Sequence, residues 1–161
     1  MVKVDGWSHR TLRTWILLCL VLTIQTNAGI GRNRAEYNAK KLKSIVDLLK
    51  KQLGITEKIQ TVVVPKNDLV VSVRPVKGHP GTFQISFEED FLNLLDEDDL
   101  RAVVAHELGH VWIFMHHPYL QTEDLANSIA YKAVTSDALD LVYEKLRSRP
   151  SAKGNLAASM H

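Results

Sequence analysis

Cysteine is almost absent from this sequence of 161 residues: Cys19 stands alone, inside an apolar run near the N-terminus. A single cysteine excludes an internal disulfide, and it also excludes the thiolate-rich sites that hold structural zinc. Any metal site must therefore use histidine and carboxylate side chains.

Long hydrophobic runs are missing as well. The most apolar run, residues 15–24, is shorter than the roughly 20 residues that a transmembrane helix needs. Basic residues precede this run and small residues, ending at Ala28, follow it, which is the layout of a secretory signal peptide. We therefore predict a signal peptide over residues 1–28 and an exported protein, periplasmic or secreted. The alternative is an uncleaved N-terminal anchor, facing the extracytoplasmic side; association with a membrane is expected only in that case.

The sequence also lacks an excess of either charge. The formal net charge is +2, and removal of residues 1–28 would lower the basic count from 20 to 17 and the acidic count from 18 to 17. The remaining chain would be close to neutral and carries no basic stripe, so we expect no nucleic-acid partner. The sequence gives no indication of an oligomeric state.

Residues 29–147 have the length and composition of one α+β domain, and residues 148–161 are expected to form a mobile tail. Periodicity predicts a helix before a sheet of three short strands, which we expect to be mostly antiparallel, and two helices after it. The predicted helices are residues 33–53, 96–116 and 121–147, and the predicted strands are residues 60–65, 69–75 and 82–87.

The helix that begins after Asp96 carries the most informative pattern, His106-Glu107-Leu108-Gly109-His110. Two histidines four residues apart lie on the same face of a helix, so both imidazoles can bind one metal ion. Glu107 follows the first histidine and is placed to accept a proton from a metal-bound water. Gly109 leaves room for a neighbouring segment. The opposite face is expected to be a core stripe, formed by Val104, Leu108, Val111, Trp112 and Met115.

A catalytic zinc ion usually has three protein ligands and one open position for water. The third ligand could be His116, His117, Glu123 or Asp124. Glu123 is favoured, with Asp124 as the alternate, because a short connection lets the next helix fold back beside the first. Asn127 shares the face of Glu123 and could accept the ring N–H of a ligating histidine.

These segments resemble the gluzincin peptidases, and most closely the CAAX-prenyl-protease and HtpX-like group. Residues 95–110, LDEDDLRAVVAHELGH, are similar to that group's active-site helix, L-x-x-x-E-L-x-A-V-x-A-H-E-x-G-H. Residues 123–127, EDLAN, resemble its E-x-x-A-D motif, in which the glutamate is the third zinc ligand. Asn127 departs from the aspartate of that motif, and the membrane spans of the group are absent.

The resemblance implies a minimal zincin-like fold that binds one zinc ion per chain through His106, His110 and Glu123. It also implies an edge strand that binds an extended peptide, for which residues 82–87 are the natural candidate, with Gln84, Ile85 and Ser86 at their centre.

We therefore predict a zinc metallopeptidase that acts on peptide or protein substrates, with Glu107 as the general base. The side chains that could stabilise the oxyanion are Tyr119, Tyr131, His116 and His117. Two alternatives stay open: a zinc-stabilised binding module without catalysis, and a latent protease that is blocked by one of its own terminal segments.

Overall fold

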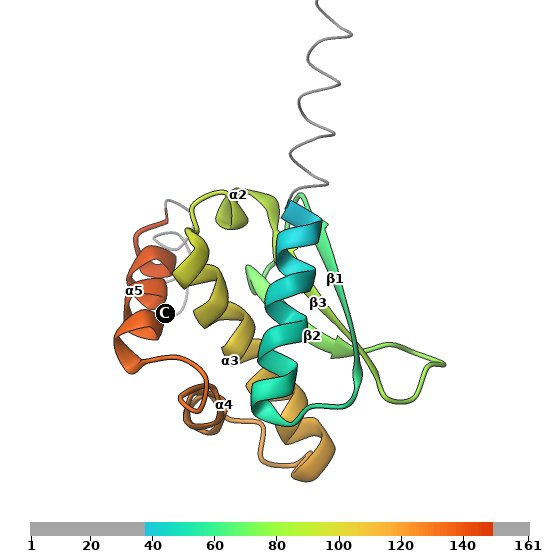
Figure 1. Ribbon diagram of the computed structural model, residues 1–161. Helices are drawn as coiled ribbons and strands as arrows, with labels where there is room; N and C mark the ends of the chain where they lie inside the picture. The colour runs from blue at the N-terminus through green and yellow to red at the C-terminus, as the bar shows by residue number, and fades with distance from the viewer. Residues whose placement is uncertain (1–37, 150–161) are drawn as a thin grey trace, which may run out of the picture. The chain divides into compact units, whose positions relative to one another are not determined.

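The computed structural model describes residues 38–149 (Figure 1). The predicted signal peptide lies outside the described residues, so export remains a prediction. Within residues 38–149, no helix is both long and apolar enough to cross a bilayer. A helix over residues 38–53 comes first. The elements that follow are β1 (Lys58–Val64), β2 (Val71–Pro75), β3 (Thr82–Glu88), α2 (Glu89–Leu92), α3 (Glu97–His116), α4 (Glu123–Ala130) and α5 (Ser136–Arg147).

The three strands form one mixed sheet in the order β1-β3-β2. β2 pairs antiparallel with β3, as expected for strands joined by a tight turn, here one that contains Gly78 and Gly81 at positive φ. β1 pairs parallel with β3, so the prediction of antiparallel pairing is wrong for this pair. The connection from β1 to β2 crosses the end of the sheet and leaves β3 in the centre. The fold class, α+β with a small sheet, is confirmed.

Helix α3 runs through the middle of the domain, and its N-terminus is fixed by a capping box. The side chain of Asp96 accepts a hydrogen bond from the backbone N–H of Asp99 at 2.9 Å, and the side chain of Asp99 accepts one from the backbone N–H of Asp96 at 2.9 Å. These bonds satisfy two N–H groups that a helix start otherwise leaves unpaired. The predicted start after Asp96 and end at His116 are therefore confirmed.

The core gathers around α3 from all sides rather than along one stripe. Val104, Leu108 and Val111 are completely buried, as predicted, but Met115 is 45% exposed because the last turn of α3 extends past the sheet. Residues 38–53 contribute a row of buried side chains to the same core, namely Leu42, Ile45, Val46, Leu49 and Leu53. Because α3 is covered on several sides, the polar side chains in the middle of this helix lie in a largely enclosed site.

The single long helix predicted over residues 121–147 is two helices, so that prediction is wrong. α4 ends at Ala130, and a turn separates it from α5, whose N-cap residue is Thr135. The side chain of Thr135 accepts a hydrogen bond from the N–H of Ala138, so it competes with a continuous helix at this point. The break lets α4 and α5 pack separately on α3 (Figure 1).

The domain also extends slightly beyond its predicted boundary at Arg147. Arg149 is only 8% exposed, forms an ion pair with Glu88 at the end of β3, and lies over the ring of Phe91 in α2. The predicted tail therefore begins too early, because these two contacts hold Arg149 to the domain. The rest of the predicted tail, from Pro150 onward, lies outside the described residues.

Candidate metal centre

Three of the predicted ligands converge on one point at the middle of α3. The Nε2 atoms of His106 and His110 lie 3.2 Å apart. Glu123 approaches from α4, with Oε2 3.1 Å from Nε2 of His106 and Oε1 3.5 Å from Nε2 of His110. One ligand atom from each side chain lies within 4.8 Å of the others. Two imidazole nitrogens and a carboxylate oxygen are a donor set that suits zinc.

Helix α4 can bring Glu123 this close because Gly109 has no side chain. A Cβ at Gly109 would lie 2.5 Å from the carbonyl oxygen of Ala126 and 3.0 Å from its Cα. The side chain of Thr122 caps α4 by accepting a hydrogen bond from Leu125 N–H, so Glu123 occupies the first helical position. The predicted close approach at Gly109 is confirmed, and it sets the position of Glu123. Asp124, the alternate ligand, is exposed and lies outside the cluster.

Each histidine is oriented by an amide oxygen on its far side. Nδ1 of His106 lies 2.7 Å from Oδ1 of Asn127, and Nδ1 of His110 lies 3.1 Å from Oε1 of Gln121. When each Nδ1 donates its proton to these oxygens, both Nε2 atoms present lone pairs to the same point. Burial lowers the pKa of His106, which favours the neutral imidazole that a metal requires.

Asn127 was predicted in this role, whereas Gln121 and Tyr143 were missed. The hydroxyl of Tyr143, on α5, donates to Oδ1 of Asn127 at 3.2 Å. Gln121 lies in the connection between α3 and α4, and its Nε2 also donates to the backbone carbonyl of His110 at 3.4 Å. Neither residue belongs to a local motif, so only the packing of the helices shows their proximity to the site.

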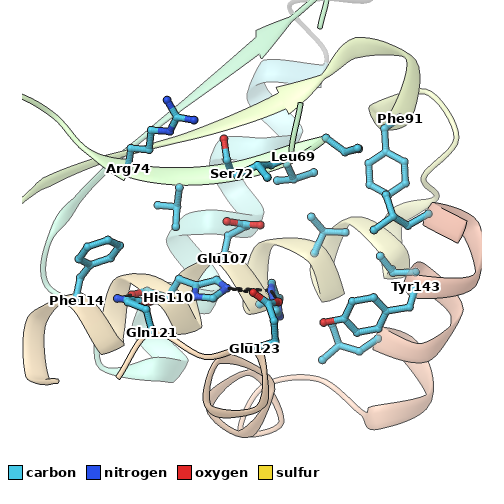
Figure 2. Close-up of a pocket in the computed structure, with 18 residues that line it drawn as sticks. Leu69, Ser72, Arg74, Phe91, Glu107, His110, Phe114, Gln121, Glu123 and Tyr143 are labelled. Carbon is cyan, nitrogen blue, oxygen red and sulfur yellow. Dashed lines mark hydrogen bonds and ion pairs between the residues drawn. The ribbon is translucent and has the colours of Figure 1, made fainter. Parts of the chain in front are cut away.

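Glu107 lies beside the cluster and is nearly inaccessible, with 7% of its surface exposed. Burial, together with the negative charge of Glu123, raises the pKa of Glu107 to about 8. A carboxylate in this position is a strong proton acceptor, because the protein stabilises its protonated form. Figure 2 shows Glu107, His110 and Glu123 gathered beneath the strand that carries Ser72 and Arg74.

The cluster opens into a cleft of about 390 Å³, a volume suited to a short stretch of substrate. β2 and the residues before it, from Leu69 to Arg74, form one wall. On the side of Tyr143 and α5 the lining is mostly apolar; it consists of Phe91, Val103, Leu139, Val142 and Leu146. Phe114 and Arg74 lie at the other end (Figure 2).

The edge strand beside the cleft is β2, so the prediction that residues 82–87 form this edge is wrong. β3 is hydrogen-bonded to β1 on one side and to β2 on the other, and Ile85 is completely buried. The backbones of Gln84 and Ser86 are therefore paired within the sheet, and these residues do not line the cleft. Their alternating pattern correctly indicated a strand but could not indicate its place in the sheet.

The chain enters β2 through a tight turn at Val70. Val70 has φ 66°, and the N–H of Val71 donates to the carbonyl of Leu69 at 2.7 Å, which closes a γ-turn around Val70. This conformation is costly for a β-branched residue. Asn67 supports the turn: its carbonyl accepts from Val70 N–H at 2.8 Å and its side chain donates to the carbonyl of Ser86 at 3.1 Å.

None of the four predicted oxyanion donors reaches the cleft. His116 stacks on Trp112, with ring centroids 4.0 Å apart, and His117 follows it at the C-cap of α3. Tyr119 is 98% exposed, and Tyr131 lies on the surface after α4. His116 and His117 lie at the far end of α3 from the cluster, and the two tyrosines are on exposed surface, so all four predictions are wrong.

The fold and the site together define a metallopeptidase domain. Residues 36–159 match the family described as Peptidase family M48. The chain therefore belongs to peptidase family M48, and the expected resemblance is confirmed.

Two known proteins of Pyrococcus abyssi are similar to this chain. A protease HtpX homologue of strain GE5/Orsay is 34% identical over 77 residues, which cover 48% of this chain and 26% of that relative. This chain thus spans about a quarter of the curated relative that it matches. The crystal structure of the metallopeptidase zymogen of abylysin has a TM-score of 0.50 at 15% identity, covering 68% of this chain and 95% of that chain. The second likeness supports the fold alone.

Proposed function

We propose that the protein is a zinc-dependent peptidase that hydrolyses peptide bonds in the cleft between β2 and α3. The observation that carries this proposal is the meeting of His106, His110 and Glu123 at one point, with the buried Glu107 beside it. Family membership supports the hydrolytic class, and the donor set supports zinc.

In the proposed reaction, Glu107 is the general base. A bound zinc ion would supply an acidified water and would polarise the scissile carbonyl. Glu107 would accept the proton of the attacking water and pass it to the leaving amine. Its burial keeps bulk water from competing for the proton. His106, His110 and Glu123 hold the site, and Asn127 and Gln121 fix the orientation of the two imidazoles.

The substrate in this proposal is an extended peptide that adds to the edge of the sheet. Among the described residues, β2 is paired on one side only, so its free backbone groups can hydrogen-bond to a peptide laid along the cleft. The apolar lining next to α5 would take an apolar side chain close to the scissile bond.

The test is a comparison of Glu107→Gln with the wild type. We expect the variant to bind zinc as the wild type does, because Glu107 is not a ligand, and to cleave a peptide library at least about 100-fold more slowly. Glu144→Gln is the matched control, since Glu144 is an exposed glutamate on α5 that lies outside the cleft and should not affect turnover. Equal cleavage by Glu107→Gln and wild type would contradict the assignment. A wild type that binds zinc and cleaves nothing would instead favour the non-catalytic binding module.

A further inference from the structure

We propose that Tyr143 is a positioning residue: it holds the side-chain amide of Asn127 with its oxygen toward His106, so that His106 presents Nε2 to the metal. The inference rests on the metal site of the proposed function, but it does not require that the protein cleave peptides.

The three side chains form a short relay across three helices. His106 on α3 and Tyr143 on α5 both bond to the same atom, Oδ1 of Asn127 on α4, at 2.7 Å and 3.2 Å. The rings of His106 and Tyr143 also meet edge to face, with centroids 6.2 Å apart. Both Asn127 and Tyr143 are partly buried, so the relay lies within the packed part of the domain.

The relay matters because the two ends of an amide differ chemically. A carboxylate offers two equivalent acceptors, but asparagine offers one acceptor and one donor. If Asn127 turned its NH₂ group toward His106, Nδ1 of His106 would become an acceptor. The ring proton would then be on Nε2, where it would block metal binding. An asparagine at this position therefore needs a partner that fixes which end faces the histidine.

Tyr143 supplies that partner. Its hydroxyl has a single proton to donate, and Oδ1 of Asn127 is the acceptor that the described residues provide for it. Rotation of the amide would place the NH₂ group where the acceptor had been, so the hydrogen bond that Tyr143 donates to Asn127 would be lost. The bond from Tyr143 thus favours the same amide orientation that metal binding by His106 requires.

This role predicts coupling between Tyr143 and position 127. Tyr143→Phe should matter with asparagine at position 127. It should not matter with aspartate there, because a carboxylate accepts from His106 in either orientation. A purely structural tyrosine would have the same effect in both cases.

The experiment is a double-mutant cycle on zinc affinity, measured on the metal-free full chain by competition with a chromophoric chelator. We expect Tyr143→Phe to weaken zinc binding by about tenfold, as is typical when a group that supports a ligand is removed. In the Asn127→Asp background, the same change should leave the affinity unaltered within error. Tyr119→Phe, on the exposed surface, is the matched control and should change neither affinity.

Equal losses in both backgrounds, or no loss with Asn127 present, would overturn the proposal. A wild type that binds no zinc would remove both this inference and the proposed function. Zinc binding without cleavage would remove only the proposed activity.

Discussion

At the scale of single residues, Glu107 combines two demands that usually conflict. It is enclosed like a core residue, yet the proposed reaction requires it to accept and release a proton. Burial and the nearby charge of Glu123 raise its pKa to about 8, so in the metal-free protein the carboxyl is mostly protonated at neutral pH. In the proposed reaction, the raised pKa makes the carboxylate of Glu107 a strong proton acceptor.

The raised pKa predicts how the stability of the metal-free protein depends on pH. The folded-state pKa of Glu107 is about 8 and its ordinary value is 4.5, so the folded state binds the proton more tightly. The stabilisation is complete below pH 4.5 and is lost as the pH rises through about 8. Urea unfolding of the metal-free protein across this window should show the decline, by a few kcal/mol.

Glu107→Gln should remove this part of the pH dependence. The difference between wild type and variant isolates the effect of Glu107 from that of His106, whose lowered pKa acts in the opposite direction and is present in both proteins. Parallel stability curves for the two proteins would show that Glu107 keeps its ordinary pKa in the folded state.

At the scale of elements, the contact between α3 and α4 determines whether the site forms. α4 carries both Glu123 and Asn127, and its backbone at Ala126 lies directly against Gly109. A glycine in the middle of a helix costs helix propensity. Here that cost is offset because only glycine, which has no Cβ, lets the backbone of α4 come this close to α3.

Gly109→Ala should therefore destabilise the protein, although alanine is the better helix former. The new Cβ would lie 2.5 Å from a backbone oxygen, so α4 must move, at a cost of about 1–3 kcal/mol, which exceeds the gain in propensity of about 1 kcal/mol. Zinc affinity should fall too, because Glu123 moves with α4. Ser128→Ala, on the exposed side of α4, is the control. A variant more stable than wild type would show that α4 is free to shift.

The elements also show what local sequence can predict. The start of α3 was predictable because Asp96 and Asp99 lie three residues apart and form a complete capping signal. The break between α4 and α5 had a signal as well, the N-cap Thr135, but the apolar periodicity on both sides obscured it. The signals for caps and ligand pairs lie within about one turn of helix, so sequence reveals them directly.

At the scale of the whole molecule, sequence predicts less, because the arrangement depends on contacts between distant residues. The three strands were expected, but nothing in their alternation indicated that β3 lies in the centre or that β1 runs parallel to it. For this reason the prediction of a peptide-binding edge falls on residues 82–87, which form the central strand. Gln121 and Tyr143 were missed for the same reason, since each reaches the site only through the packing of helices.

The candidate metal cluster and the cleft beside it nevertheless lie within residues 69–146, on β2, α2, α3, α4, α5 and the segments that join them. The sequence predicted His106, Glu107, His110, Glu123 and Asn127, and the structure brings these five side chains together. We expect this cluster to bind one metal ion.

Zinc content of the purified full chain, after reloading and dialysis, tests that claim most directly. We predict about one zinc per chain in the wild type and in Glu107→Gln, and none in His106→Ala. His116→Ala should keep its zinc, because His116 stacks on Trp112 away from the cluster. A wild type that retains no zinc after reloading, or a His106→Ala variant that retains as much as the wild type, would contradict the account.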